Sequence, residues 1–331
     1  MKVLISASWL GGAGGAERAL FSILRALRDD DVDVVVRKDL GGPYAVVPGR
    51  VRVRSLKEWR WRGAERSDGL PGLLSGRVLN PLRARLNPPY DVHYHLSAGC
   101  QVGAAARARV RLLNPAGLTI KPSEARAFDF LALESPDNSR FAPAGARRIL
   151  LPPPLYDLSK TADDRDFDLP DAWYLTAFNP YRRVKGAEDL LLAADEAPHP
   201  IVWCHSKRTL DWTMPTGLSG HPNIIHVDDP TPAQLRYLYE NCAAYVSFSR
   251  SEGFGWSVAD ALRYSGTIVS RPIGILSFPE ARQSGFVPVG ETWQVNWDAL
   301  PAGSAAADRD LSWLSPAAFR STLERLVASQ R

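Results

Sequence analysis

The stretch AAYVSFSRSEGFGWSVADALRYSGTIVSRPIG, residues 243–274, decides the fold of this chain. It opens with an apolar run, residues 244–248, whose β-branched and aromatic side chains predict a buried strand. A loop, residues 249–255, precedes a segment with apolar residues at helical spacing, and residues 267–270 return to strand. Strand–loop–helix–strand is the usual connection of a parallel sheet. We therefore expect an α/β fold whose ligand binds at the carboxyl ends of the strands, beside the loop.

Two carboxylates lie in this stretch. Glu252 is in the loop, and Asp260 follows eight positions later, two helical turns deeper. A helix that begins near Trp256 would direct both acids toward one cleft, and Gly253 and Gly255 would let the backbone approach a bound group. An ionised carboxylate only accepts hydrogen bonds, which suits sugar or ribose hydroxyls. The plainer interpretation is a surface glutamate and a helix acid favoured by the helix dipole.

The segment SEGFGWSVADAL, residues 251–262, resembles the Glu-x7-Glu motif of retaining glycosyltransferases of family 4, which have the GT-B fold. The residues of this region that agree with the family pattern are Ser249, Glu252, Gly253, Phe254, Gly255 and Ala261. Asp260 replaces the second glutamate and is one methylene shorter. The resemblance implies that Glu252 contacts the donor sugar, that Asp260 contacts the nucleotide ribose, and that Gly253, Phe254 and Gly255 form the donor-binding loop.

A second segment, NPYRRVKG at residues 179–186, resembles the family's diphosphate-binding turn. Lys185 and Gly186 match the family pattern, whereas Asn-Pro stands where the family has Gly-Arg. The resemblance implies that Lys185 stabilises the charge on the leaving diphosphate, the electrostatic contribution that usually counts most. Arg183, as a catalytic residue, or Arg182, as a donor contact, would replace the missing arginine, and the sequence leaves open which of the two does so.

A glycine-rich turn follows the first predicted strand, residues 3–6, and precedes a segment of helical spacing. Its glycines are not ordered G-x-G-x-x-G, and no acidic residue is placed to hold a ribose, which argues against dinucleotide binding. Gly14 and Gly15, with the Ala-Glu-Arg that follows, resemble the GGAER segment of family 4, where this loop borders the donor phosphates and the acceptor. The plainer interpretation is a tight turn with a helix cap.

Residues 50–66, RVRVRSLKEWRWRGAER, combine basic and aromatic side chains. Alternating Arg and Val at the start predict a half-exposed strand. Trp59 and Trp61 lie among the basic residues up to Arg66, a combination that suits an anionic membrane interface. It suits a nucleic-acid backbone with stacked bases equally well. The plainer interpretation is a solvated edge strand whose Trp rings fold inward.

Four residues of the amino-terminal half are candidates for the acceptor side: Trp59 and Trp61 of the basic segment, together with His95 and Asn114. His93 and His95 share one side of a predicted strand at residues 92–95. Asn114 ends the next predicted strand, where many family members have a histidine. We therefore expect polar contacts to the acceptor from His95 and Asn114, although an isolated histidine is more often a satisfied core or surface residue.

Length and charge indicate two domains with different partners. A chain of 331 residues is longer than a domain with a single hydrophobic core usually is. Residues 152–168 have the composition of a linker. We expect an acceptor-side domain at residues 1–154, a nucleotide-sugar domain at 155–315, and a terminal helix at 316–331 that crosses back to the first domain. Residues 1–154 contain 24 Lys and Arg against 14 Asp and Glu, whereas the remainder contains 16 against 22.

The cysteines Cys100, Cys204 and Cys242 show no metal-ligand spacing, which favours a reducing compartment. No apolar run reaches the ~18 residues of a membrane span, and the first residues predict a strand rather than a signal peptide. We expect a cytoplasmic protein, with peripheral membrane association through residues 50–66 as an option. Neither a metal site nor a cofactor is expected, because a nucleoside-diphosphate sugar would be the substrate.

These observations predict two doubly wound, Rossmann-like domains that face a cleft, the GT-B architecture. The predicted reaction is the transfer of a sugar, with retention of configuration, from a nucleoside-diphosphate sugar to an acceptor. The acceptor would be a lipid-linked glycan, a nucleic acid or a small molecule. The alternative is a non-catalytic nucleotide-sugar-binding protein, supported by the lost Gly-Arg pair, by Asn114 and by the replacement of the second glutamate by Asp260.

Overall fold

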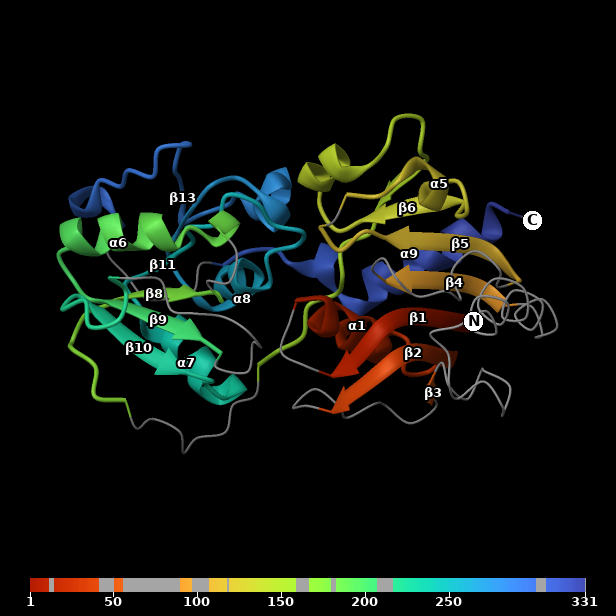
Figure 1. Cartoon of the computed structure of the whole chain (residues 1–331), viewed down its shortest axis with the longest axis horizontal. Helices are drawn as coiled ribbons and strands as arrows, with labels where there is room; N and C mark the ends of the chain where they lie inside the picture. Colours follow the sequence, from red (N-terminus) through yellow and green to blue (C-terminus); the bar gives the residue numbers. More distant parts are fainter. Residues whose placement is uncertain are drawn as a thin grey trace, which may run out of the picture. The chain divides into compact units, whose positions relative to one another are not determined.

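The chain forms two compact α/β units in a computed structural model (Figure 1). The first comprises Met1–Leu155 and Ser312–Arg331, and the second comprises Tyr156–Leu311. The structure describes residues 1–11, 15–41, 51–55, 90–96, 107–117, 119–158, 167–179, 183–206, 217–301 and 308–330. No helix in these ranges is both long and apolar enough to cross a membrane.

The first unit is built on a seven-stranded parallel sheet of order β3-β2-β1-β4-β5-β6-β7. Its strands are β1 (Lys2–Gly11), β2 (Asp31–Gly41), β3 (Val51–Ser55), β4 (Tyr90–Leu96), β5 (Ala108–Asn114), β6 (Phe130–Leu133) and β7 (Arg148–Leu150). Its described helices are α1 (Gly15–Ala26), α5 (Pro122–Ala125), η3 (Pro136–Phe141), η8 (Ser312–Leu314) and α9 (Pro316–Ala328). The helical spacing after the glycine-rich turn correctly predicted α1, which buries Leu20, Ile23 and Leu24.

The C-terminal helix α9 packs in the first unit although it follows the whole second unit in sequence (Figure 1). It lies against α1, β4 and β5. The ring of Phe319 contacts that of Tyr94, with centroids 6.4 Å apart. Arg320 forms an ion pair of 3.0 Å with the buried Asp30. Apolar packing and a charged contact therefore both fix this helix to the first sheet.

The second unit is built on a six-stranded parallel sheet of order β10-β9-β8-β11-β12-β13. Its strands are β8 (Tyr174–Ala177), β9 (Ile201–His205), β10 (Ile224–Asp228), β11 (Ala244–Val246), β12 (Ile268–Ser270) and β13 (Phe286–Pro288). Its described helices are η4 (Arg183–Lys185), α6 (Ala187–Glu196), α7 (Pro232–Asn241), α8 (Trp256–Tyr264), η5 (Gly274–Ser277), η6 (Pro279–Ala281) and η7 (Trp297–Ala299).

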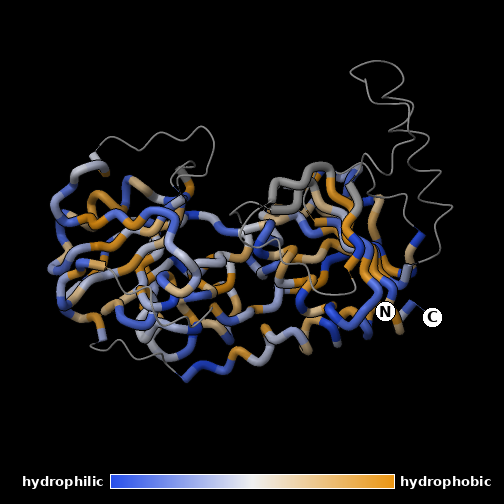
Figure 2. The backbone as a smooth tube through the Cα atoms, turned by 90° about the horizontal axis from the view of Figure 1, so that it is seen from below, coloured by the Kyte–Doolittle hydropathy of each residue, from blue (hydrophilic) through white to orange (hydrophobic). Residues whose placement is uncertain are grey.

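Hydrophobic residues concentrate in the strands of both sheets (Figure 2). Residues 3–5 of β1 and 34–36 of β2 are fully covered, as are residues 201–203 of β9. Continuous apolar runs of this kind are typical of parallel strands that are covered on both faces. The strands that the sequence predicted within the described ranges are present, and β13 is an additional strand that was not predicted.

Candidate functional site

The order of the strands reverses once in the second sheet. From β8 the chain adds β9 and β10 on one side, and it then adds β11, β12 and β13 on the other. In open α/β sheets, ligands bind at such a switch point, outside the carboxyl ends of the two central strands. The segments that leave β8 and β11 at this edge contain Lys185 and Glu252. The topology of the second unit therefore places the candidate site between these two residues.

A salt bridge joins the two residues across the switch point. Lys185 Nζ donates to Glu252 Oε1 at 2.6 Å. The Lys185 side chain is 22% exposed and that of Glu252 is 12% exposed, so both charges are largely covered but reach the surface. The site thus holds one cation and one anion in direct contact. The cation suits a phosphate group, and the carboxylate suits hydroxyl donors.

The turn that contains Lys185 is held directly against the loop that follows β11. Gly186 has φ +75°, and a Cβ at this position would lie 2.3 Å from the Phe248 carbonyl oxygen. The backbone N–H of Arg250 donates to the Val184 carbonyl at 2.7 Å. Only glycine permits both the left-handed backbone and this close approach. The Lys185-Gly186 pair is therefore a structural requirement for placing the lysine beside Glu252.

A second glycine supports Glu252 from the other side. Gly274, after β12, has φ +56°, and a Cβ there would lie 2.6 Å from the Phe254 carbonyl oxygen and 2.9 Å from Glu252 Cβ. The Ile275 N–H donates to the same Phe254 carbonyl at 2.7 Å. Gly255, with φ +85°, is the N-cap residue that directly precedes α8. Backbone contacts from Gly274 and Ile275 thus fix the loop from Glu252 to Gly255.

Asp260 lies on the second turn of α8 and is only 4% exposed. Burial raises the pKa of the Tyr245 phenol, and the charges of Glu252 and Asp260 raise it further, whereas a hydrogen bond with Ser257 lowers it. The two carboxylates therefore influence one phenol, although Glu252 reaches the surface and Asp260 does not. The sequence motif correctly placed Asp260 on the helix that follows the loop. It did not predict that this side chain is buried.

Three further charged residues surround the base of the site, and the motif analysis did not include them. The carboxylate of Asp189, on α6, receives two hydrogen bonds from Arg250, at 2.7 and 3.2 Å, and one from Arg271 at 3.1 Å. Arg271 also donates to the Phe248 carbonyl at 2.8 Å and to the Glu291 carbonyl at 2.8 Å. This network ties α6 and the ends of β11 and β12 together, and the Arg250 backbone N–H joins it to Val184, the neighbour of Lys185.

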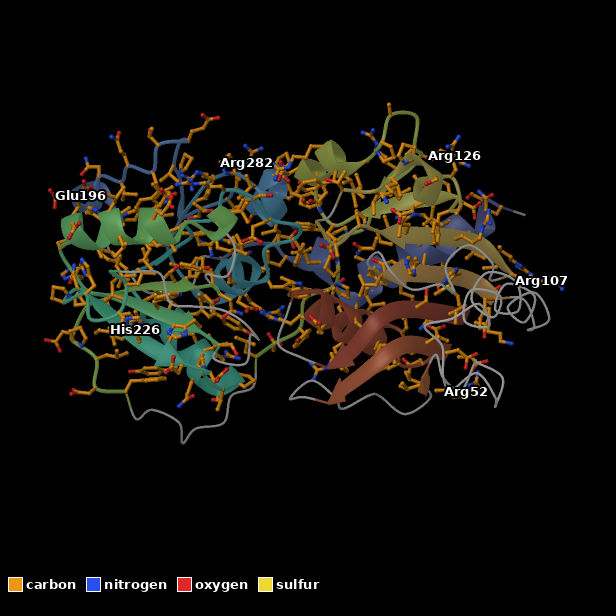
Figure 3. The ribbon with its side chains drawn as sticks, in the orientation of Figure 1. Arg52, Arg107, Arg126, Glu196, His226 and Arg282 are labelled. Carbon is orange, nitrogen blue, oxygen red and sulfur yellow. The ribbon has the colours of Figure 1, made fainter. Side chains whose placement is uncertain are left out.

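The other predicted donor-side residues are placed as follows. Gly253 lies in the loop, and Phe254 is buried in a T-shaped contact with Trp256, with centroids 4.9 Å apart. Arg183 begins η4, and only its backbone is described. Gly15 is the first residue of α1. Gly14, Arg182, Trp59 and Trp61 lie outside the described residues, as does residue 66. Residues 51–55 form the edge strand β3, which contains Arg52 (labelled in Figure 3). Arg52 forms ion pairs with Asp31 and Asp33.

His95 is part of a buried cluster in the first unit. Ser6 Oγ lies 2.8 Å from His93 Nε2 and 2.8 Å from His95 Nδ1, and the Phe128 ring stacks on His95 with centroids 5.5 Å apart. Burial lowers the pKa of His93 to about 3 and that of His95 to about 4. Both imidazoles are therefore neutral near pH 7.

Asn114 lies on the opposite face of that sheet from His95. His95 pairs with Leu113 in the register of β4 and β5, so the next residue, Asn114, points the other way. Its Nδ2 donates to the Tyr94 hydroxyl at 2.7 Å and to Glu134 Oε1 at 3.1 Å, and its Oδ1 accepts from the Ala116 N–H at 2.7 Å. His95 and Asn114, two of the predicted acceptor-side residues, are thus not brought together.

Glu134 is a buried acid that the sequence analysis missed. It follows β6, is 4% exposed, and burial raises its pKa to about 7, while the hydrogen bond from Asn114 acts in the opposite direction. A glutamate directly after an apolar strand was the available signal. Arg271, directly after β12, carried the same signal, and Asp189 had only its position one turn after the Lys-Gly pair.

No protein-family model matches the chain, and no curated protein matches it by sequence. Solved structures with a similar fold exist. HepE from Anabaena in complex with UDP-glucose is 16% identical, with a TM-score of 0.70 over 99% of this chain and 100% of that chain. Sucrose-phosphate synthase from Thermosynechococcus elongatus is 16% identical, with a TM-score of 0.60 over 100% of this chain and 94% of that chain.

The lipopolysaccharide outer core galactosyltransferase WaaB, in its apo form, is 11% identical, with a TM-score of 0.60 over the full length of both chains. Identities this low show a shared fold and no more. The two parallel sheets of this chain and these neighbours confirm the sequence-based prediction of an α/β fold of the GT-B type.

Proposed function

We propose that this protein is a glycosyltransferase of the family 4 type, which transfers a sugar from a nucleoside-diphosphate sugar with retention of configuration. The observation that carries the proposal is the contact of 2.6 Å between Lys185 and Glu252 at the switch point of the second sheet. It puts a phosphate-binding cation beside a hydroxyl-binding anion, the two chemistries that an activated sugar presents. Support comes from the shared fold with HepE, whose structure contains UDP-glucose.

In the proposed reaction, Lys185 and one of Arg182 and Arg183 stabilise the charge that develops on the leaving diphosphate. Glu252 accepts hydrogen bonds from the sugar hydroxyls, and the loop of Gly253, Phe254 and Gly255 lines the sugar. Asp260 is buried, so its carboxylate would have to become more exposed to contact the ribose. We propose that these cations replace a metal ion, so turnover should be unchanged in EDTA.

A thermal-shift screen over UDP-, GDP-, ADP- and dTDP-hexoses tests donor binding without knowledge of the acceptor. A ligand that binds only the folded chain raises its melting temperature. We expect at least one nucleotide sugar to do so, and the shift to be smaller in Glu252→Ala, whereas Glu240→Ala, on the exposed side of α7, should keep it in full. No shift with any nucleotide sugar would contradict the proposal.

The second candidate is a nucleotide-sugar-binding protein without transferase activity. Asn114, at the position where family members have a histidine, uses both amide N–H groups on Tyr94 and Glu134 and accepts from the Ala116 N–H. This residue therefore has no N–H left to donate to a reacting sugar. This alternative would be excluded if the wild type releases nucleoside diphosphate from the donor and Glu252→Ala does not.

A further inference from the structure

Lys185 and Glu252 are each other's only ion-pair partner among the described residues. In the part of the chain that the structure describes, the two charges are thus paired with each other before any ligand binds. Both side chains are largely covered, so a charge that loses its partner here is not fully compensated by water. Glu252 is also confined, because the backbone of Gly274 lies against its Cβ.

We infer that this salt bridge makes the site selective for the intact sugar donor over the free nucleoside diphosphate, an inference that rests on the proposed function. In the resting chain, Glu252 competes with phosphate for the ammonium group of Lys185. A diphosphate that takes Lys185 separates the pair and leaves the carboxylate without a partner. Ligands then differ in whether they supply a replacement.

An intact nucleoside-diphosphate sugar supplies one, because its hydroxyls donate to the carboxylate that Lys185 has released. A free diphosphate supplies none, and its terminal phosphate brings additional negative charge close to Glu252. Hydrogen bonds to charged groups are strong, and a charged group left buried without one is costly. Glu252 therefore acts twice, by favouring the donor and by opposing the product.

This second action separates the inference from a simple sugar contact. A residue that only contacts the sugar would leave the affinity for the free diphosphate unchanged when it is replaced. A residue that competes for Lys185 would instead weaken diphosphate binding in the wild type, so its neutralisation should strengthen that binding.

Isothermal titration calorimetry with UDP-glucose and UDP, and with GDP-mannose and GDP, tests the inference on the full chain. In the wild type, we expect the intact donor to bind at least about tenfold more tightly than its diphosphate. In Glu252→Gln, we expect the donor to bind more weakly than to the wild type, and the diphosphate to bind more tightly by a factor of about three or more. The ratio of the two dissociation constants should then approach one. Glu240→Gln, which removes the same charge from an exposed position of the second unit, should retain the wild-type ratio.

Glu252→Ala provides a second variant with the same expectation should the glutamine side chain disturb the loop, and thermal unfolding verifies that each variant is folded. A diphosphate affinity that is unchanged or reduced in both variants would overturn the inference while leaving the proposed function intact. The absence of binding by both ligand pairs to the wild type would overturn both.

Discussion

Asp189 accepts hydrogen bonds from two arginines and is the residue on which the base of the site depends. Arg271 is 7% exposed, and Asp189 is its only carboxylate partner in the described part of the chain. Removing one partner of a buried ion pair leaves an uncompensated charge, which typically costs several kcal/mol. Asp189 also raises the pKa of Arg250 by its hydrogen bonds and its charge.

We therefore expect Asp189→Asn to lower the free energy of unfolding by about 3 kcal/mol in urea denaturation. Glu188→Gln is the matched control, since its side chain is 65% exposed and lies 4.0 Å from Arg250, and exposed pairs at such distances contribute about 0–1 kcal/mol. Equal effects of the two substitutions would show that Asp189 does not support the buried arginine.

Glu134 makes stability depend on pH in a direction opposite to that of most carboxylates. Its pKa is about 7 in the folded chain against a usual value of 4.5. The folded state therefore binds the proton more tightly than the unfolded state, and stability falls as pH rises from about 4.5 to 7. The buried His93 and His95 have the opposite effect. Their pKa values are lower in the folded chain than in the unfolded chain, so the unfolded state binds more protons below pH 6.5, and stability decreases as pH falls.

A comparison of the wild type with Glu134→Gln isolates the first effect, since both proteins contain the histidines and glutamine still accepts from Asn114. We expect the variant to gain up to about 3 kcal/mol of stability relative to the wild type between pH 4.5 and pH 8. Urea denaturation at several pH values measures this difference. A constant difference over that range would contradict the assignment of a buried, protonated Glu134.

At the scale of elements, the approach of α6 to the end of β11 depends on Gly186. Gly220 provides a matched comparison: it also has a positive φ, +81°, but an added Cβ would meet no atom within 4 Å. Alanine in a left-handed conformation costs about 1 kcal/mol by itself. The clash with the Phe248 carbonyl adds to this at Gly186 alone.

We expect Gly220→Ala to cost about 1 kcal/mol and Gly186→Ala about 3 kcal/mol or more, with a loss of donor binding in Gly186→Ala only. Thermal unfolding and calorimetry provide the two readouts. Similar costs for both alanines would mean that the close approach of α6 and β11 does not constrain the Lys185 turn.

The local elements were the most predictable part of the molecule. Apolar runs and helical spacing identified β11, α8 and β12 because each is buried along most of its length. The resemblance singled out Lys185 and Glu252 with separate roles, but the salt bridge between them came only from the structure. Asp189, Arg271 and Glu134 could not be inferred, because their roles depend on contacts between segments up to 82 positions apart, as for Asp189 and Arg271.

At the scale of the whole molecule, residues 1–154 have an excess of basic residues, 24 against 14 acidic. Within the described residues, several of these cations are paired inside the first unit, such as Arg111 with Asp129 at 2.8 Å. If the acceptor is anionic, as a lipid-linked glycan at a membrane or a nucleic acid would be, we expect the cations of residues 50–66 to bind it; the structure describes this segment only in β3.

We expect the chain to bind vesicles containing anionic lipid, with an affinity that falls steeply as salt rises. Neutral vesicles are the control, and duplex DNA is the competing probe. Replacement of Lys57, Arg60, Arg62 and Arg66 by glutamine should abolish this binding while leaving the donor-induced thermal shift unchanged. Salt-dependent binding to DNA but not to vesicles would instead favour a nucleic-acid acceptor.

The central claim is that Lys185 and Glu252 bind opposite ends of an activated sugar. A crystal structure of the chain with the nucleotide sugar identified by the thermal-shift screen tests it most directly, without knowledge of the acceptor. The account predicts the diphosphate at Lys185 and the sugar hydroxyls at Glu252, with the salt bridge between the two side chains opened. A ligand bound away from this pair, or an intact salt bridge beneath a bound donor, would contradict it.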